Sequence, residues 1–556
     1  MAAAEKRPVL LLGANDRAMF TFARQLKRLG FRVEVADGSP SKVQRSRFVD
    51  KFHRLTDPRI SASGTANDLL SLIDRVPFEF IVPINDEALE LCIANRDPIS
   101  ERTLILGLPT DEVYELSHDK SALLERCVEL GIPVPRSVTI RSLEDLGGDI
   151  DALGYPMIVK PAFSKLIRGD RMLAFTVRTV RDRMSAIDKV RELVATCPVI
   201  LQERLGGHGA GYNFLASDGE VLLEYGHERV TEPIEGGQSS YRRTIPVDRY
   251  GLSDHSRKLL RETRWTGIGM IEFRIEGSEA YVMEINGRPW GSIELGVFAG
   301  VNIPEAMVRF FYGHENPEKG IVAKSVAARN FKLDLRYAAK RTISARSPVP
   351  ILKWLWDLRR TFSSSETVED NPLRDPFYGI REYAELVADA GRKVMRKKTV
   401  ELADNSDDRS PKPGDRIGFL CYGNICRSPF AEHLAASRYR DFEFRSYGSY
   451  PIPDRMVPTL AEKVGKERFG ISLTDHRSRL LTQEDVSECD LVYAMDRSNV
   501  REFVTDFPEA RGKIRLLAGS EIEDPYGKGE DAFQAVFEEI AGALDTIFGG
   551  HSGNQP

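Results

Sequence analysis

The fold of the C-terminal part is decided by the stretch Arg416-Ile-Gly-Phe-Leu-Cys-Tyr-Gly-Asn-Ile-Cys-Arg-Ser-Pro429. Its apolar run from Ile417 to Leu420 is typical of a buried strand, which would end at Cys421. A loop and then a helix opened by Pro429 should follow, since proline is tolerated in the first turn of a helix. A strand, a loop and a helix N-terminus in this order can hold a phosphate through backbone N–H groups and the helix dipole.

The side chains of this loop suit phosphate chemistry. Cys421 would lie at the bottom of the loop, where the helix dipole and Arg427 favour the thiolate over the thiol. The guanidinium of Arg427 can hold two phosphate oxygens at once, and Ser428 can donate a hydrogen bond to the sulfur. Gly423 and Asn424 suit the positive-φ turns that aim N–H groups inward. The alternative, a buried structural cysteine before a capped helix, leaves this combination of residues unexplained.

The order of Cys, five residues, Arg and Ser resembles the signature of the low-molecular-weight protein tyrosine phosphatases. The resemblance implies that Cys421 forms a phosphocysteine. It also implies that the phosphate is bound by a loop of five residues, which are Tyr422, Gly423, Asn424, Ile425 and Cys426. The run Glu523-Asp-Pro-Tyr526 resembles the acid loop of that family, so Asp524 would protonate the leaving oxygen. The implied catalytic residues of this half are Cys421, Arg427, Ser428 and Asp524.

Three further apolar runs predict the rest of this domain. Strands near Phe442–Arg445, Leu491–Ala494 and Ile514–Leu517 alternate with helices, which predicts a doubly wound parallel sheet. In such sheets a ligand binds at the carboxyl ends of the strands, where Cys421 lies. The second loop cysteine, Cys426, suggests an oxidative switch, although it could instead only fill the apolar side of the loop.

Composition narrows the class of protein. A chain of 556 residues predicts about two to four domains. The net charge of −5 gives no general attraction to nucleic acid or to an anionic membrane. No apolar run is long enough to cross a bilayer, and the first residues lack an apolar signal core. Six scattered cysteines without zinc-like spacing favour a reduced, cytoplasmic protein. No feature indicates an oligomeric state.

The chain begins with a βαβ pattern. Strands are predicted at Pro8–Gly13 and Arg32–Ala36, with a helix to about Leu29 between them, a third strand at Phe78–Pro83 and an edge strand at Leu106–Pro109. A dinucleotide site would need three glycines where this chain has one, which disfavours NAD. These residues predict a small α/β domain.

Two lysines mark a nucleotide site in the next part. Lys120 precedes a helix at Ser121–Leu130, and Lys160 ends a strand in Gly154–Pro161, with a Gly-Ile-Pro-Val-Pro turn between them. This arrangement resembles the ATP-grasp enzymes. The resemblance implies that Lys120 and Lys160 reach the phosphates of ATP and that Gln202 and Glu203 contact adenine. The alternative is two surface lysines and an ordinary strand.

A hairpin supplies the metal ligands. Strands Gly269–Arg274 and Ala280–Asn286 are predicted to join through a three-residue loop, which places Glu272 opposite Glu284. Facing carboxylates repel each other unless a cation lies between them, and with the Asn286 amide they suit Mg²⁺ or Mn²⁺. Arg288 follows where it could stabilise charge on a transferred phosphoryl group. The Glu…Glu-x-Asn-x-Arg pattern resembles ATP-grasp as well, and the alternative is a solvated acidic hairpin.

Some segments depart from these patterns. The loop 162–169 has fewer glycines than the phosphate-binding lid of the ATP-grasp family. The charges of Lys165 and Arg168 could replace the backbone N–H donors that such a lid supplies. The loop 235–243 is either an acceptor-binding loop or a solvated turn. The amphipathic helix Ile351–Arg360 is expected to pack on the ligase-like domain rather than to touch a membrane or glycan. A further helix is predicted at 379–398 and a flexible linker after it.

The predicted architecture is α/β and α+β, with a pre-ATP-grasp domain and an ATP-grasp fold before the doubly wound phosphatase sheet. The expected boundaries are 1–113, 114–315, a helical extension at 316–400, a linker at 401–413 and the phosphatase at 414–550.

The sequence favours a bifunctional enzyme. One half would join a small-molecule carboxylate to an amine through an acyl phosphate, using ATP. The other half would hydrolyse a phosphomonoester or phosphotyrosine. The alternative is a tyrosine phosphatase regulated by a non-catalytic, nucleotide-sensing ATP-grasp module. A third possibility is that both halves act in turn on one metabolite.

Overall fold

The computed structural model describes residues 7–13, 17–39, 45–147, 150–233, 238–318, 320–345, 347–369, 375, 410–450 and 454–549. It divides into two compact units, which are described separately below. The first comprises residues 1–139, 160–177 and 202–386, and the second comprises 140–159, 178–201 and 387–556. In the described part of the chain, no helix is long and apolar enough to span a membrane.

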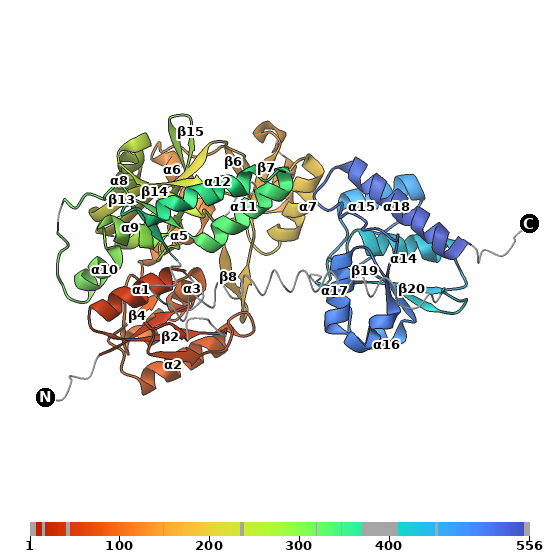
Figure 1. Ribbon diagram of the computed structural model, residues 1–556, viewed down its shortest axis with the longest axis horizontal. Helices are drawn as coiled ribbons and strands as arrows, with labels where there is room; N and C mark the ends of the chain where they lie inside the picture. Colours follow the sequence, from red (N-terminus) through yellow and green to blue (C-terminus); the bar gives the residue numbers. More distant parts are fainter. Residues whose placement is uncertain are drawn as a thin grey trace, which may run out of the picture. The chain divides into compact units, whose positions relative to one another are not determined.

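The first unit opens with a five-stranded parallel sheet in the order β3-β2-β1-β4-β5 (Figure 1). The sheet confirms the βαβ opening, and the predicted edge strand at 106–109 lies two residues later than β5. The strands are β1 (Pro8–Leu12), β2 (Arg32–Asp37), β3 (Lys51–Arg54), β4 (Phe80–Pro83) and β5 (Leu104–Ile105), and the helices are α1 (Arg17–Arg28), α2 (Ala62–Arg75), α3 (Asp86–Ala94) and α4 (Arg96–Ser100).

A seven-stranded sheet forms the rest of this unit, in the order β16-β15-β12-β13-β14-β17-β18. Its strands pair antiparallel except β17 and β18, which are parallel. The strands are β12 (His208–Ser217), β13 (Glu220–Thr231), β14 (Tyr241–Ile245), β15 (Gly267–Glu276), β16 (Glu279–Asn286), β17 (Ala327–Arg329) and β18 (Glu366–Val368), and the helices beside them are α5 (Asp111–His118), α6 (Lys120–Glu129), α8 (Leu252–Glu262), α9 (Ile293–Ala299) and α10 (Ile303–Phe311).

The region after residue 316 packs partly on this sheet. It supplies β17, β18 and the helices α11 (Phe331–Ala345) and α12 (Val349–Asp357). On α12, Trp354 lies against Phe331 with ring centroids 5.3 Å apart and donates its N–H to Asp334 at 2.8 Å. Trp356 remains 67% exposed, and the partners of Trp354 lie on α11, within the same extension, so these contacts do not test the expected packing on the ligase-like domain. The predicted helix at 379–398 and most of the linker lie outside the described residues.

A smaller sheet, in the order β10-β7-β11-β6, lies between residues 137 and 203. Its strands β7 and β11 end at Pro161 and Glu203, and Lys160 and Gln202 at these strand ends are counted among the residues of the first unit. The predicted loop after Pro161 instead forms a two-stranded hairpin. Lys165, in this hairpin, forms an ion pair with Glu87 of α3 at 2.5 Å. The elements are β6 (Ser137–Ile140), β7 (Met157–Pro161), β8 (Lys165–Arg168), β9 (Arg171–Ala174), β10 (Arg178–Val180), α7 (Arg183–Val194) and β11 (Val199–Glu203).

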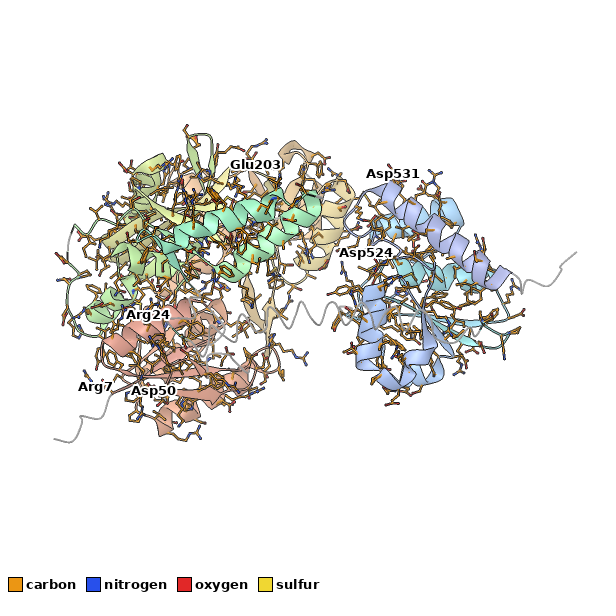
Figure 2. The ribbon with its side chains drawn as sticks, in the orientation of Figure 1. Arg7, Arg24, Asp50, Glu203, Asp524 and Asp531 are labelled. Carbon is orange, nitrogen blue, oxygen red and sulfur yellow. The ribbon has the colours of Figure 1, made fainter. Side chains whose placement is uncertain are left out.

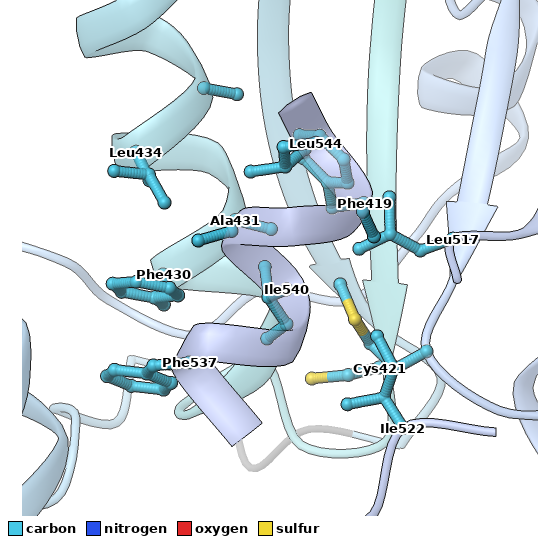
Figure 3. Packing of buried hydrophobic residues seen from close by; sticks show 14 of the residues in the cluster. Phe419, Cys421, Phe430, Ala431, Leu434, Leu517, Ile522, Phe537, Ile540 and Leu544 are labelled. Carbon is cyan, nitrogen blue, oxygen red and sulfur yellow. The ribbon is translucent and has the colours of Figure 1, made fainter. Parts of the chain in front are cut away.

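The C-terminal part of the second unit is a four-stranded parallel sheet in the order β20-β19-β21-β22, which confirms the predicted doubly wound sheet. Its core includes the stacked rings of Phe430, on the helix that follows Cys421 in the chain, and Phe537, on the last helix, with ring centroids 3.8 Å apart (Figure 3). The elements are β19 (Arg416–Cys421), α14 (Arg427–Arg438), β20 (Glu443–Gly448), α15 (Thr459–Phe469), α16 (Gln483–Glu488), β21 (Leu491–Ala494), α17 (Arg497–Asp506), β22 (Ile514–Leu516) and α18 (Glu530–Phe548).

Candidate active sites

The first candidate site is the loop between β19 and α14. Strand β19 ends at Cys421 as predicted, whereas α14 begins at Arg427, two residues before the predicted start at Pro429. Proline fits there because the N–H groups of a first helical turn have no partner within the helix. The Cys421 Sγ lies 3.0 Å from the Ser428 Oγ and accepts the Asn424 N–H at 3.2 Å. The sulfur therefore accepts one backbone N–H, and the Ser428 hydroxyl, which also lies 3.2 Å from the Tyr447 carbonyl, is within hydrogen-bond distance of it.

Asn424 holds the loop in shape. Its φ of +51° is a left-handed conformation, which asparagine tolerates better than most residues. Its side chain donates to Ser428 at 3.0 Å and to Ser446 at 2.9 Å, and it accepts the Arg479 N–H at 2.9 Å. The backbone carbonyl of Asn424 accepts from His476 Nε2 at 2.9 Å. Burial lowers the pKa of His476, although this hydrogen bond acts in the opposite direction.

Arg427 supplies a buried positive charge. Its side chain is 3% exposed, and its Nη1 donates to Asp496 at 2.8 Å and to the Ile522 carbonyl at 2.9 Å. Among the described residues, its buried Nε has no hydrogen-bond partner. Burial alone would lower the pKa of Arg427, but Cys421, Asp524 and Asp496 raise it. A buried cation with a free N–H suits a bound oxyanion.

The predicted acid lies beside this arginine. The Asp524 Oδ2 is 3.4 Å from Arg427 Nη2, and the carboxylate is about half exposed to solvent. Asp524 is labelled in Figure 2. Tyr526 accepts a hydrogen bond from Arg455 at 2.5 Å. Tyr422 is 53% exposed, and its ring centroid lies 5.8 Å from that of Tyr450. These two tyrosines flank the loop and the acid in the sequence, and each contacts a residue from another segment, Arg455 or Tyr450.

The second loop cysteine has a different environment. Cys426 is buried, and its pKa is raised well above the ordinary value by burial first and then by Asp524 and Cys421. Ile425 is buried beside it in the same apolar cluster. Burial therefore disfavours the thiolate of Cys426, and because only the Cys421 sulfur accepts the Asn424 N–H in this loop, Cys421 is the better candidate nucleophile. All six cysteines are free thiols.

The second candidate site lies in the first unit around the two predicted lysines. Lys120 and Lys160 are both buried, at 7% and 5% exposure. Lys120 donates to Ser164 at 2.8 Å, and Lys160 lies 3.4 Å from the Met283 carbonyl. Burial, with help from Lys120 and against Glu284, lowers the pKa of Lys160 to about 8. Two neighbouring buried cations are costly unless an anion neutralises them.

The hairpin brings Glu272 opposite Glu284, as predicted, but by a different route. Its turn has two residues, Gly277 and Ser278, because Glu276 pairs directly with Glu279, so the predicted three-residue loop is wrong. The register shifts between Glu272 and Phe273, and this bulge restores the pairing that a two-residue turn alone would have lost.

The bulge involves Met283. Phe273 pairs with Val282 and Glu272 pairs with Glu284, which leaves Met283 without a partner residue in the register. The carbonyl of Met283 is the oxygen that lies within reach of Lys160. The irregular strand thus serves both the carboxylate pair and the lysine.

Two predicted groups of this site already have partners. Glu272 pairs with Arg229, and burial first, then Glu284, raises the pKa of Glu272 while Arg229 lowers it. Arg288 holds Asp86 through two contacts, at 2.6 and 2.9 Å. The Asn286 amide lies 3.4 Å from Glu272. A small cavity lies beside these groups, lined in part by Asp86, Lys120, Glu284 and Asn286.

The predicted adenine contacts behave differently from each other. Gln202 is fully buried, and within the described residues neither polar atom of its amide has a partner. A buried amide without partners is costly, so it fits a site that a polar ligand completes. Glu203 instead accepts the backbone N–H of Arg136 at 2.8 Å and its Nε at 2.7 Å (Figure 2). The carboxylate of Glu203 therefore already accepts two hydrogen bonds from Arg136.

Sequence reasoning missed Asp86, Arg229, Asp496 and Arg455. Only Asp496 carried a local signal, since it follows the end of β21 and caps α17. The carboxyl ends of parallel strands meet at one edge of a sheet, so an acid there could have been assigned to the phosphate site.

Together, the two sites combine a thiol and a guanidinium on a phosphate-binding loop with paired lysines and carboxylates suited to a nucleotide. Residues 416–550 match the family model for low molecular weight phosphotyrosine protein phosphatase. Residues 196–332 match the model for ATP-grasp in the biosynthetic pathway with Ter operon.

Known proteins resemble the C-terminal part. The low molecular weight protein-tyrosine-phosphatase Etp of Escherichia coli K12 is 36% identical over 122 residues, which are 21% of this chain and 82% of Etp. The probable low molecular weight protein-tyrosine-phosphatase AmsI of Erwinia amylovora is 33% identical over a stretch that covers 22% of this chain and 88% of AmsI. Among solved structures, a low molecular weight protein tyrosine phosphatase from T. tengcongensis is 32% identical in sequence and has a TM-score of 0.24. The match covers 25% of this chain and 99% of that protein. Through residues 416–550, the chain belongs to the low molecular weight protein-tyrosine-phosphatase family, and it also carries an ATP-grasp region.

Nucleotide affinity should depend on pH through Lys160. An ATP-grasp region implies ATP binding, and a bound triphosphate favours the protonated lysine. Since the pKa of Lys160 is about 8, affinity should be flat below that pH and fall above it, by up to about tenfold per pH unit. Titration calorimetry with ATP from pH 6.5 to 9.5 measures this slope. The variant Lys160→Arg, which stays charged, should lack it. A flat profile in the wild type, or an equal slope in both proteins, would contradict the assignment.

Proposed function

We propose that the chain is a bifunctional enzyme, in which one half hydrolyses phosphomonoesters or phosphotyrosine and the other half uses ATP to join a carboxylate to an amine. The observation that carries the first activity is the Cys421 sulfur, which lies within 3.2 Å of the Asn424 N–H and 3.0 Å of the Ser428 hydroxyl. The domain division used in this proposal is 1–113, 114–315, 316–400, 401–413 and 414–550.

The hydrolysis proceeds in two steps. The thiolate of Cys421 attacks the phosphorus while Asp524 gives its proton to the leaving oxygen, so the P–O bond breaks as the S–P bond forms. Asp524 then accepts a proton from the water that cleaves the S–P bond, which releases phosphate and restores the thiolate. Arg427 and the loop N–H groups of residues 422–426 stabilise the negative charge on the phosphoryl oxygens. Ser428 stabilises the departing sulfur.

The ligase half is supported by the buried lysines, the carboxylate pair and the amide of Gln202 without partners. Lys120 and Lys160 would hold the phosphates of ATP. Glu272, Glu284 and Asn286 would hold Mg²⁺ or Mn²⁺, which would neutralise charge on the phosphates. The chain would transfer the terminal phosphoryl group to a carboxylate, and an amine would then displace phosphate to form the amide. Arg288 would stabilise the transferred group after release from Asp86.

A nucleotide-sensing module is the second candidate. It is supported by the partners of Arg288 and Glu272, because both groups that the chemistry needs are held by other residues. ADP release that depends on both an added carboxylate and an added amine would support the ligase. Binding of ATP with no ADP release under any such mixture would support the sensor.

Loss of the nucleophile should separate the two activities. Cys421→Ser should abolish hydrolysis of an aryl phosphate, because a serine hydroxyl is far less acidic than the thiol, and should leave ATP turnover unchanged. Phosphate release and ADP release are measured on the same preparation. Cys489→Ser, a buried cysteine outside the loop, is the matched control and should keep both activities. Loss of both activities in Cys421→Ser would contradict the division into two sites.

Neutralising one member of the carboxylate pair should remove metal-dependent ATP turnover. Glu284→Gln should reduce ADP release by on the order of a hundredfold, because the cation loses one of its two charged ligands. Glu279→Gln, on the exposed end of the same strand, is the control and should be neutral. Turnover near the wild-type rate in Glu284→Gln would identify the hairpin as an acidic surface only.

Cys426 should protect the nucleophile from oxidation. Peroxide converts a thiolate to a sulfenic acid, which a neighbouring thiol can trap as a disulfide with loss of water. Peroxide should therefore inactivate the phosphatase reversibly in the wild type, and recovery with dithiothreitol should be much poorer in Cys426→Ser. The recovered fraction of aryl phosphatase activity is the measurement. Full recovery of the variant after the same dose would rule out this role.

A further inference from the structure

A cluster of two histidines and one carboxylate lies on the phosphatase domain outside the loop residues. Glu432 and His433 are neighbours on α14, and His476 follows α15. One ligand atom of each lies within 4.8 Å of the other two. The imidazole rings of His433 and His476 have centroids 6.2 Å apart and are nearly perpendicular, at 78°. The three possible ligands therefore come from two separate segments of the domain.

The hydrogen bond of His476 fixes which of its nitrogens is available. Its Nε2 lies 2.9 Å from the carbonyl oxygen of Asn424. A carbonyl oxygen only accepts, so Nε2 must carry the proton, and in the neutral ring Nδ1 then has a free lone pair. Histidines that bind metals usually donate their other N–H to a carbonyl or carboxylate in this way. His476 is 9% exposed, which holds its ring in one orientation.

Glu432 is held in a comparable way. Its Oε2 accepts the hydroxyl of Ser446 at 2.6 Å, so the carboxylate is oriented while its second oxygen can still coordinate. Ser446 in turn accepts from the Asn424 side chain. Two of the three ligands thus have outer partners that orient them, as coordinating residues in metal sites usually do.

We propose that Glu432, His433 and His476 form a Zn²⁺ site on the phosphatase domain. Two imidazoles and one carboxylate are a set that zinc favours, whereas Mg²⁺ and Ca²⁺ favour oxygen ligands alone. Donor atoms around a tetrahedral zinc ion lie about 3.3 Å apart, so small side-chain rotations close the present separations. Three protein ligands leave a fourth position for water.

The site would act on the phosphate loop. His476 holds the carbonyl of Asn424, and Glu432 reaches the Asn424 side chain through Ser446. Zinc bound between them would tie α14 to the segment around His476 and would restrain Asn424, which donates its N–H to the Cys421 sulfur. The ion binds the folded domain and would raise its thermal stability.

The test measures zinc itself, so it does not depend on the phosphatase activity. The full chain carrying Cys421→Ser, which removes the reactive thiolate as a competing ligand, is titrated with Zn²⁺ against a chromophoric chelator. His433→Ala in that background removes one ligand without touching Asn424 or Ser446, and His255→Ala, on helix α8, is the control. We expect the affinity for one equivalent of Zn²⁺ to fall by at least about a hundredfold in His433→Ala and to be unchanged in the control.

A second variant and a second measurement complete the test. Glu432→Gln keeps an oxygen for Ser446 but removes the charge, and it should weaken the same equivalent. Zinc should also raise the melting temperature of the transition assigned to the phosphatase domain in the Cys421→Ser background, and this rise should disappear in His433→Ala. Identical zinc titrations for the parent, His433→Ala and Glu432→Gln, or a melting temperature that zinc does not change, would overturn the proposal.

Discussion

The phosphatase site depends on one residue, Asn424, and on the left-handed backbone that it adopts. Its N–H, carbonyl and side chain together reach Cys421, Ser428, Ser446, Arg479 and His476. These five partners come from both sides of the loop and from two other segments of the domain, β20 and the stretch after α15. A residue with φ of +51° that is fully buried is kept in place by such bonds, which offset the cost of its conformation. The position of the sulfur relative to the helix N-terminus follows from this single anchor.

Local patterns predicted the strands and the phosphate loop well. The run Ile417–Leu420 and the strands at 491–494 and 514–516 are short, mostly apolar segments that each begin directly after a charged residue, so each carries its own signal. The loop was predictable because all its chemistry lies within a few consecutive positions. The start of α14 was placed two residues late, since Pro429 is compatible with several positions in a first turn.

Contacts between residues that are distant in the sequence were harder to predict. Asp86 and Arg288 are 202 positions apart, and Arg229 lies 43 positions from Glu272. Nothing in either neighbourhood indicates the other member of these pairs. The opposition of Glu272 and Glu284 was predicted, but the assumed turn was wrong, because a bulge at a single residue leaves no mark on the alternation of the strand. A correct pairing was thus reached through an incorrect loop.

The bond between Asp86 and Arg288 sets a threshold on the charge of a ligand. Asp86 starts α3, three residues after the end of β4, so its carboxylate acts as a tethered anion at a high local concentration. A neutral molecule has nothing to offer the guanidinium that would compete with this carboxylate. An anion must bind the arginine more strongly than Asp86 does, and part of its interaction energy is spent on that exchange. The N-terminal sheet, which contributes no catalytic group in this proposal, would in this way select among the molecules that reach the nucleotide site.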